Sequence, residues 1–117
     1  MSNTGSAEYI EKARHFADQA ASRVEEIDEG RRIPADLAGE MADAGLFRIL
    51  VPKSLGGAEI DHPSFVEIVR IFARADASTA WCVNQNNIFS TDSSRMPLEA
   101  AQTIWGEQRG IVTNGPP

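Results

Sequence analysis

Proline and glycine divide this sequence into short segments, and within most segments the apolar residues recur at steps of three or four. Such spacing gathers apolar side chains on one side of an α-helix, so each segment predicts a short amphipathic helix. Helices of this kind become stable by packing their apolar sides on one another. The pattern therefore predicts a compact all-α bundle of five to six helices within residues 1–110.

The sequence also carries start and stop signals for these helices. Ser6, Ser78 and one of Asp61 or His62 are expected to cap helix starts, because their side chains can accept hydrogen bonds from free backbone N–H groups. Proline suits the first turn of a helix, and glycine suits its end. The predicted helices run from Ser6 to Gly30, from Pro34 to Gly45, from Pro63 to the region Ala73–Asp76, from Ser78 to about Ser94, and from Pro97 to Gly106.

The segment between the second and third helices lacks a helical period. Leu46–Val51 is an apolar run that precedes Pro52, which predicts a short, buried, extended segment. Gly56 and Gly57 follow, and at least one of them is expected to adopt a positive φ angle. The segment contains neither of the glycine-rich patterns GxGxxG and GxxxxGK that cradle phosphates, so it predicts a shaped turn rather than a nucleotide site.

The last residues also depart from the helical pattern. Ile111 and Val112 predict the beginning of a β-strand, and a single strand leaves its backbone hydrogen-bonding groups unpaired. We therefore expect residues 111–117 to be the start of a β domain that continues beyond Pro117.

Composition and charge narrow the classes of partner. The net charge is −6, from 17 acidic and 11 basic residues. Nucleic acids and anionic membranes are bound mainly through clustered Lys and Arg, so this balance argues against both. The first residues lack the basic and apolar regions of a signal peptide, and no apolar stretch reaches the ~20 residues that span a membrane. These features favour a cytoplasmic protein.

Residues that often carry chemistry are few. Cys82 is the single cysteine, and its apolar neighbours favour a small buried side chain over a reactive thiol. One cysteine and two histidines at scattered positions do not make a metal site. Trp81 and Trp105 are expected in the hydrophobic core rather than stacked on a cofactor. No nucleophile, base and orienting group occur at an informative spacing, so no catalytic residue is assigned.

The fourth predicted helix contains an unusual run of amides, Asn84-Gln85-Asn86-Asn87. Asparagine is unfavourable inside helices because its side chain competes for backbone hydrogen bonds. Helical spacing puts Asn84 and Asn87 on one side and Asn86 and Ser90 on another. Two interpretations stay open from the residues: a polar wall that faces a ligand, or a solvated side with no role.

Several short motifs occur together in an informative order. Ala-Gly-Leu-Phe at 44–47 is followed by Val-Pro-x-x-x-Gly-Gly at 51–57 and by Asp-x-Ser-Thr-Ala-Trp at 76–81. This combination resembles the N-terminal helical domain of the acyl-CoA dehydrogenase superfamily, from about Glu8 to Thr113. The Ser-Thr-Ala-Trp form resembles in particular the flavin-dependent monooxygenase branch.

The resemblance implies an activity and its partners. Monooxygenases of this branch hydroxylate aromatic or heterocyclic substrates, using reduced FMN or FADH2 from a separate flavin reductase. The dehydrogenase branch instead uses bound FAD to desaturate acyl-CoA thioesters, which is the first alternative. A non-catalytic helical fragment that packs on partner subunits is the second alternative. The resemblance further implies a homo-oligomer, usually a homotetramer, for the full-length protein.

The resemblance also implies which residues face the ligands. In this superfamily the fourth helix lines the substrate cavity, so the implied substrate-binding residues are Asn84, Asn86, Asn87 and Ser90. Relatives of the monooxygenase branch often have a histidine in this segment, and Asn86 is its nearest counterpart here. An amide can orient a substrate but cannot supply imidazole acid–base chemistry. Thr113 and Asn114 are implied as cofactor contacts.

Overall fold

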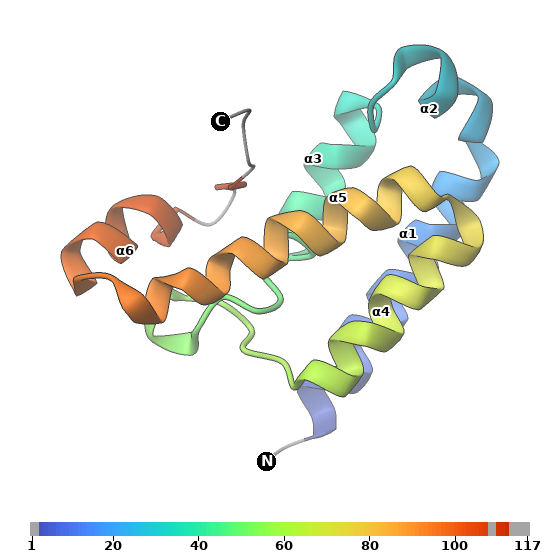
Figure 1. Cartoon of the computed structure of the whole chain (residues 1–117). Helices are drawn as coiled ribbons and strands as arrows, with labels where there is room; N and C mark the ends of the chain where they lie inside the picture. Colours follow the sequence, from blue (N-terminus) through green and yellow to red (C-terminus); the bar gives the residue numbers. More distant parts are fainter. Residues whose placement is uncertain (1–2, 108–109, 113–117) are drawn as a thin grey trace.

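The computed structural model describes residues 3–107 and 110–112 (Figure 1). These residues form six α-helices and two short 3₁₀ helices and contain no β-strand, which confirms the predicted all-α class and the number of helices. In chain order the elements are α1 (Asn3–Ser22), α2 (Val24–Gly30), α3 (Ala35–Asp43), the 3₁₀ helix η1 (Lys53–Leu55), α4 (His62–Ala75), α5 (Ala77–Ile88), the 3₁₀ helix η2 (Phe89–Arg95) and α6 (Leu98–Trp105).

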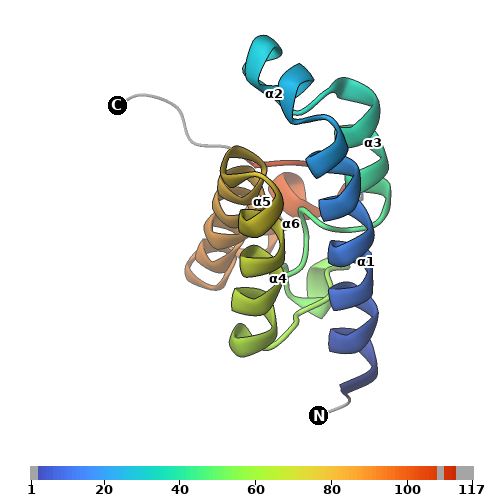
Figure 2. The ribbon, with the colours of Figure 1, turned by 90° about the vertical axis from the view of Figure 1, so that its right-hand side faces the viewer.

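The helices pack in two layers. α4 and α5 lie on one side of the molecule and α1 and α3 on the other, as Figure 2 shows. α1 packs along α4, α4 packs against α5, and α6 contacts both 3₁₀ helices. One side of α5 therefore faces outward in the orientation of Figure 1.

Two hydrophobic clusters hold the layers together. The larger cluster lies between α1, α3, α4 and α5 and includes Phe16, Phe65 and Phe72. The smaller cluster joins Val51 and Leu55 to Trp105, which is 4% exposed and therefore buried as predicted. Burying large apolar side chains such as these stabilises a fold by about 1.5–3 kcal/mol each.

The first predicted helix is divided into two. The expectation of one helix from Ser6 to Gly30 is wrong, because α1 begins at Asn3 and the helix breaks at Arg23. Ser6 lies inside α1, and its hydroxyl donates to Asp61 Oδ1 at 2.7 Å instead of capping a helix. Gly30 does end α2, but the residue that adopts the left-handed conformation is Arg31, with φ of 54°.

The connection from α3 to α4 is a compact turn, as predicted. Leu46–Val51 is buried but forms no strand, and it is covered by the returning segment, in which Ile60 N–H donates to the Ile49 carbonyl at 3.0 Å. Gly56 has a φ of 84°, which confirms the expected positive angle. A Cβ atom on Gly57 would lie 2.1 Å from the Val51 carbonyl oxygen, so a side chain at this position cannot fit.

Aspartates cap the two central helices. The Asp61 carboxylate accepts from Ser64 N–H at 3.0 Å and caps α4, as one of the two predicted options. The expectation that Ser78 caps the next helix is wrong, because the Asp76 carboxylate accepts from Thr79 N–H at 2.8 Å. The predicted fourth helix ends as an α-helix at Ile88 and continues as η2.

The region after α6 is described only in part. Residues 110–112 have no regular structure, and Val112 packs on the smaller cluster. Thr113 and Asn114 lie outside the described residues. The expected β domain over residues 111–117 therefore stays a prediction.

Candidate functional site

α5 differs from the other helices in carrying no charged side chain. Its start is fixed by Asp76, whose carboxylate also accepts from the hydroxyls of Ser78 and Thr79 at 2.7 and 2.6 Å. Partial burial raises the pKa of the Asp76 carboxyl, but the hydrogen bonds from Thr79 and Ser78 outweigh this, so the net pKa lies below its ordinary value. The cap therefore stays ionised at neutral pH and holds α5 in place.

Asn87 makes a complete set of hydrogen bonds inside the protein. Its Oδ1 accepts from the backbone N–H groups of Ile49 and Leu50 at 2.6 and 3.2 Å. Its Nδ2 donates to the carbonyls of Leu46 and Val83 at 2.9 and 2.8 Å. An amide offers two acceptor sites and two donors, so Asn87 has no capacity left for a ligand.

Ser90 is brought next to Asn87, on the inner side of the helix. Both side chains are fully buried, and the Ser90 hydroxyl donates to the backbone carbonyl of Asn87 at 2.5 Å. These two members of the predicted substrate-binding set thus face the core in this chain. Asn87 joins α5 to the segment Leu46–Leu50, and Ser90 of η2 bonds back to the end of α5.

Asn84 and Asn86 differ from Asn87 in their hydrogen bonding. They lie about 200° apart around the helix, so they flank α5 rather than form one wall. Asn84 is half-buried, and Asn86 is 7% exposed. Neither side chain has a hydrogen-bond partner in the described part of the chain, whereas Asn87 has four. Their substrate-binding role stays a prediction.

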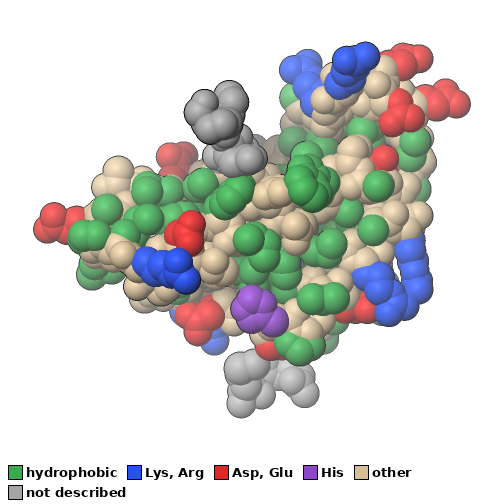
Figure 3. All heavy atoms as spheres, in the orientation of Figure 1, with side chains coloured by type: hydrophobic (Ala, Val, Ile, Leu, Met, Phe, Trp, Pro, Cys, Tyr) green, Lys and Arg blue, Asp and Glu red, His purple; other side chains and the backbone are tan. Residues whose placement is uncertain are grey.

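Trp81 corrects one sequence-based expectation and points to the outward side of α5. It was expected in the core, but it is 64% exposed. Ile88, seven residues later and 40% exposed, lies on the same side, with the half-buried Gln85 between them. Figure 3 shows hydrophobic and uncharged side chains along the course of α5, with charged side chains mainly toward the edges of the molecule.

Sequence reasoning missed this outward stripe of Trp81, Gln85 and Ile88. The spacing of four and then three residues is a helical signal that could have found it. The amide run drew attention to side-chain polarity, and tryptophan is more often buried than exposed. The stripe lies opposite the inner side of α5, where Ala80 and Val83 are buried.

Cys82 is half-buried beside the outward stripe. Burial, and secondarily the charge of Asp76, raise the pKa of the Cys82 thiol. A thiol is nucleophilic as the thiolate, so this environment favours an inert side chain. The predicted structural role of Cys82 is therefore consistent with its surroundings.

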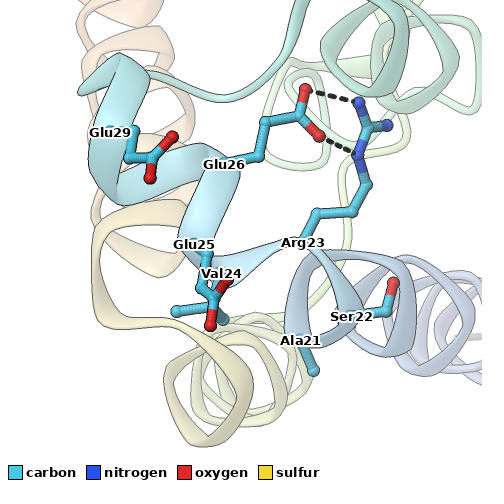
Figure 4. A pocket seen from close by; sticks show the side chains of 7 residues that line it. All are labelled: Ala21, Ser22, Arg23, Val24, Glu25, Glu26 and Glu29. Atoms are coloured by element: carbon cyan, nitrogen blue, oxygen red, sulfur yellow. Dashed lines mark hydrogen bonds and ion pairs between the residues drawn. The ribbon is translucent and has the colours of Figure 1, made fainter.

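One large cavity lies away from α5, at the corner between α1 and α2. It has a volume of about 700 Å³ and is lined by the residues drawn in Figure 4. Arg23 lies at the break between the two helices and donates to Glu26 and to Asp36 of α3. Hydrogen bonds from Arg23 lower the pKa of both carboxyls. The corner is an open groove lined by several glutamates, and the charge of Arg23 is already compensated by the carboxylates of Glu26 and Asp36.

Two further classes of site lack support in the described residues. No group of three or more His, Cys, Asp or Glu in this part of the chain could hold a metal ion. None of the helices formed by residues 3–107 is both long and apolar enough to cross a membrane.

The outward side of α5, with amides and apolar groups, can bind and orient a flat neutral ring but offers no acid–base group.

Comparison with known proteins gives the family. Residues 6–96 match the family described as acyl-CoA dehydrogenase, N-terminal domain. The chain is 29% identical over 89 residues to the flavin-dependent monooxygenase oxygenase subunit HsaA of Rhodococcus jostii, covering 76% of this chain and 23% of that protein. It is 31% identical over 94 residues to indole-3-acetate monooxygenase of Pseudomonas putida, covering 80% of this chain and 24% of that protein.

A third relative is named as a reductase subunit rather than a monooxygenase. The chain is 39% identical over 64 residues to the caffeyl-CoA reductase-Etf complex subunit CarC of Acetobacterium woodii, covering 53% of this chain and 17% of that protein. The chain thus spans about a quarter or less of the length of these relatives. No solved structure matches it. Because the match over residues 6–96 includes more than half of the chain, this protein belongs to the family of acyl-CoA dehydrogenase N-terminal domains.

Proposed function

We propose that this chain is the N-terminal helical domain of a two-component flavin-dependent monooxygenase that hydroxylates aromatic or heterocyclic substrates. The observation that carries this proposal is the similarity to two monooxygenases over 76% and 80% of the chain. In this proposal, residues 1–110 form the helical domain and residues 111–117 begin a β domain.

The outward side of α5 supports a role as one wall of the substrate pocket. Trp81 and Ile88 offer apolar surface, and Asn84 offers an uncharged donor and acceptor at its flank. Asn86, at 7% exposure, lies farther round the helix toward the inner side. A neutral aromatic ring fits this chemistry, because no charged group of α5 has to lose its water. The proposed work of α5 is to orient the substrate and to exclude water from the reacting atoms.

The proposed cofactor is a flavin, FAD or FMN. When bound, reduced flavin would supply the electrons that activate oxygen. The uncharged stripe on α5 suits a flavin ring but holds no cation for the flavin phosphates. Thr113 and Asn114 remain the candidates for cofactor contacts in this chain. A flavin reductase is the proposed protein partner, and a homo-oligomer is the proposed state of the full-length enzyme.

An acyl-CoA dehydrogenase or a related acyl-CoA enzyme is the second candidate. It is favoured by the identity of 39% to a caffeyl-CoA reductase subunit, which is higher than the identity to either monooxygenase but extends over fewer residues. A helical fragment that only packs on partner subunits is a third reading.

Activity assays on the complete protein that carries this domain separate the candidates. One assay combines it with NADH, a flavin reductase and aromatic compounds. The other supplies acyl-CoA thioesters and an artificial electron acceptor. Hydroxylated product in the first assay is the expected result. Acceptor reduction in the second assay with no hydroxylation would identify the dehydrogenase instead, and inactivity in both would favour the packing role.

Substitution of Asn86 tests the site within the same protein. Asn86→Ala is expected to lower turnover about fivefold, since a neutral hydrogen bond to the substrate is worth roughly 1 kcal/mol. Gln19→Ala, which removes an exposed amide on α1, serves as the matched control and should leave turnover unchanged. Equal turnover of the two variants would remove Asn86 from the proposed site.

A further inference from the structure

A second cavity lies between α1, the end of α3 and the turn after η1. Its volume is about 140 Å³, and none of the residues that line it belongs to α5. It is distinct from the proposed substrate wall. Its lining includes Tyr9 and Lys12 of α1, Asp43 to Gly45 at the end of α3, Arg48, and Gly56 to Ala58.

Arg48 is a buried cation without a carboxylate partner. Its side chain is 5% exposed, and it donates to the carbonyls of Glu107 and Leu55 at 2.8 and 2.9 Å. No carboxylate in the described part of the chain lies within ion-pair distance of it. A guanidinium has five N–H donors, so two bonds leave donors unused. A buried charge of this kind is costly unless an opposite charge compensates it.

The guanidinium is directed toward the turn that borders the cavity. A Cβ atom added to Gly56 would lie 3.7 Å from Arg48 Nη2, which shows that the two are neighbours. Burial lowers the pKa of Arg48, and Tyr9 acts weakly in the opposite direction. Arginine nevertheless stays protonated at physiological pH, so the cavity keeps a positive charge on this side.

Lys12 and Tyr9 of α1 add donors to the lining of the cavity. Lys12 Nζ donates to the Ala44 carbonyl at 3.1 Å and lies 4.4 Å from the centre of the Tyr9 ring. It also pairs with Glu8 of the same helix at 3.3 Å. The Tyr9 hydroxyl lies against Gly45, where a Cβ atom would come within 3.0 Å of it. Two cations, one of them paired with Glu8, thus border one small space together with the Tyr9 phenol and the Asp43 carboxylate.

We propose that this cavity binds a small oxyanion, that is, a carboxylate or phosphate group, held by Arg48, Lys12 and Tyr9. A guanidinium fork and an ammonium are the usual donors for such groups. The volume of about 140 Å³ admits one oxyanion group. Asp43 also lines the cavity, so the anion binds toward Arg48 and Lys12 and away from that carboxylate. The site is independent of the activity proposed above.

Titration of the 117-residue chain with inorganic phosphate and with acetate tests the site. The readouts are the melting temperature and the NMR signal of the Arg48 Nε–H group. Sodium chloride at equal ionic strength controls for screening. A saturable change with phosphate, acetate or both supports the proposal, and the responding anion identifies the group. A change that chloride reproduces in full would overturn it.

Three variants test whether the anion binds in this cavity. Lys12→Gln removes one cation from a half-buried position and is expected to weaken anion binding about tenfold. Ala58→Met fills the cavity without changing charge and should abolish the saturable response. Arg95→Gln removes an exposed cation outside the cavity and should bind like the original chain. Unchanged binding by both Lys12→Gln and Ala58→Met would refute the site.

Discussion

The side chain of Asn87 joins two parts of the chain that are far apart in sequence. It connects the middle of α5 to the buried segment Leu46–Leu50 through bonds to both N–H and C=O groups. That segment lacks secondary-structure partners for these groups, so the amide substitutes for a neighbouring strand. Asparagine is unfavourable inside helices, but here its bonds to a segment outside the helix compensate for that cost.

Asn87→Ala is expected to destabilise the protein by about 2–4 kcal/mol, because it leaves buried N–H and C=O groups unpaired. Asn84→Ala, a half-exposed neighbour without a partner in the described residues, should cost under about 0.5 kcal/mol. Urea unfolding followed by circular dichroism measures both. Similar midpoints for the two variants would show that the amide of Asn87 is not a structural bond.

Residue types predicted some roles in the site and missed others. The amide run identified α5 as chemically unusual. Its spacing grouped Asn86 with Ser90, whereas the structure brings Ser90 to Asn87 in the 3₁₀ helix that follows α5. Which side of α5 faces the core could not be predicted, because this depends on contacts with the segment Leu46–Leu50, about 40 residues away in the chain. Trp81 was missed for the same reason, since exposure is decided by what packs on the helix rather than by side-chain type.

Among the elements, α5 depends on its aspartate cap. The folded protein lowers the pKa of Asp76 below the value of an unfolded aspartate, about 3.9. The unfolded chain then binds more protons in acid than the folded one. The stabilisation is fully present above the unfolded pKa and is lost as the pH falls through the folded pKa.

Asp76→Asn is therefore expected to flatten the loss of stability below about pH 4. Asp76→Ala should cost about 1–2 kcal/mol at neutral pH through loss of the cap. Melting temperatures from pH 7 down to acid unfolding measure both effects. Glu40→Gln, which removes an exposed carboxylate outside the caps, is the control. This account would be contradicted if the melting temperature of Asp76→Asn fell with decreasing pH as steeply as that of the original chain.

At the scale of elements, proline and glycine predicted most helix ends correctly. Pro97 and Gly106 border α6, and Gly45 follows α3 with a φ of 82°. The break at Arg23 could not be predicted, because the apolar spacing continues across it. Arg23 is held by Glu26 in the next turn and by Asp36 in another helix, and the second of these contacts exists only in the folded molecule.

For the whole molecule, the isolated chain is expected to bind FAD and FMN weakly. The outward side of α5 offers one apolar surface and no cation, so it covers only one side of a ring and leaves the phosphates without partners. Gel filtration of the chain with excess flavin, followed by absorbance of the protein peak, should show little flavin. Stoichiometric co-elution would contradict the expectation.

The two tryptophans provide intrinsic fluorescent reporters in opposite environments. Trp81, at 64% exposure, should emit at long wavelength and be readily quenched by iodide, whereas Trp105, at 4% exposure, should be protected. In a Trp105→Phe background, a blue shift of Trp81 emission would register any ligand or domain that covers α5. In a Trp81→Phe background, a red shift of Trp105 emission would register opening of the smaller hydrophobic cluster.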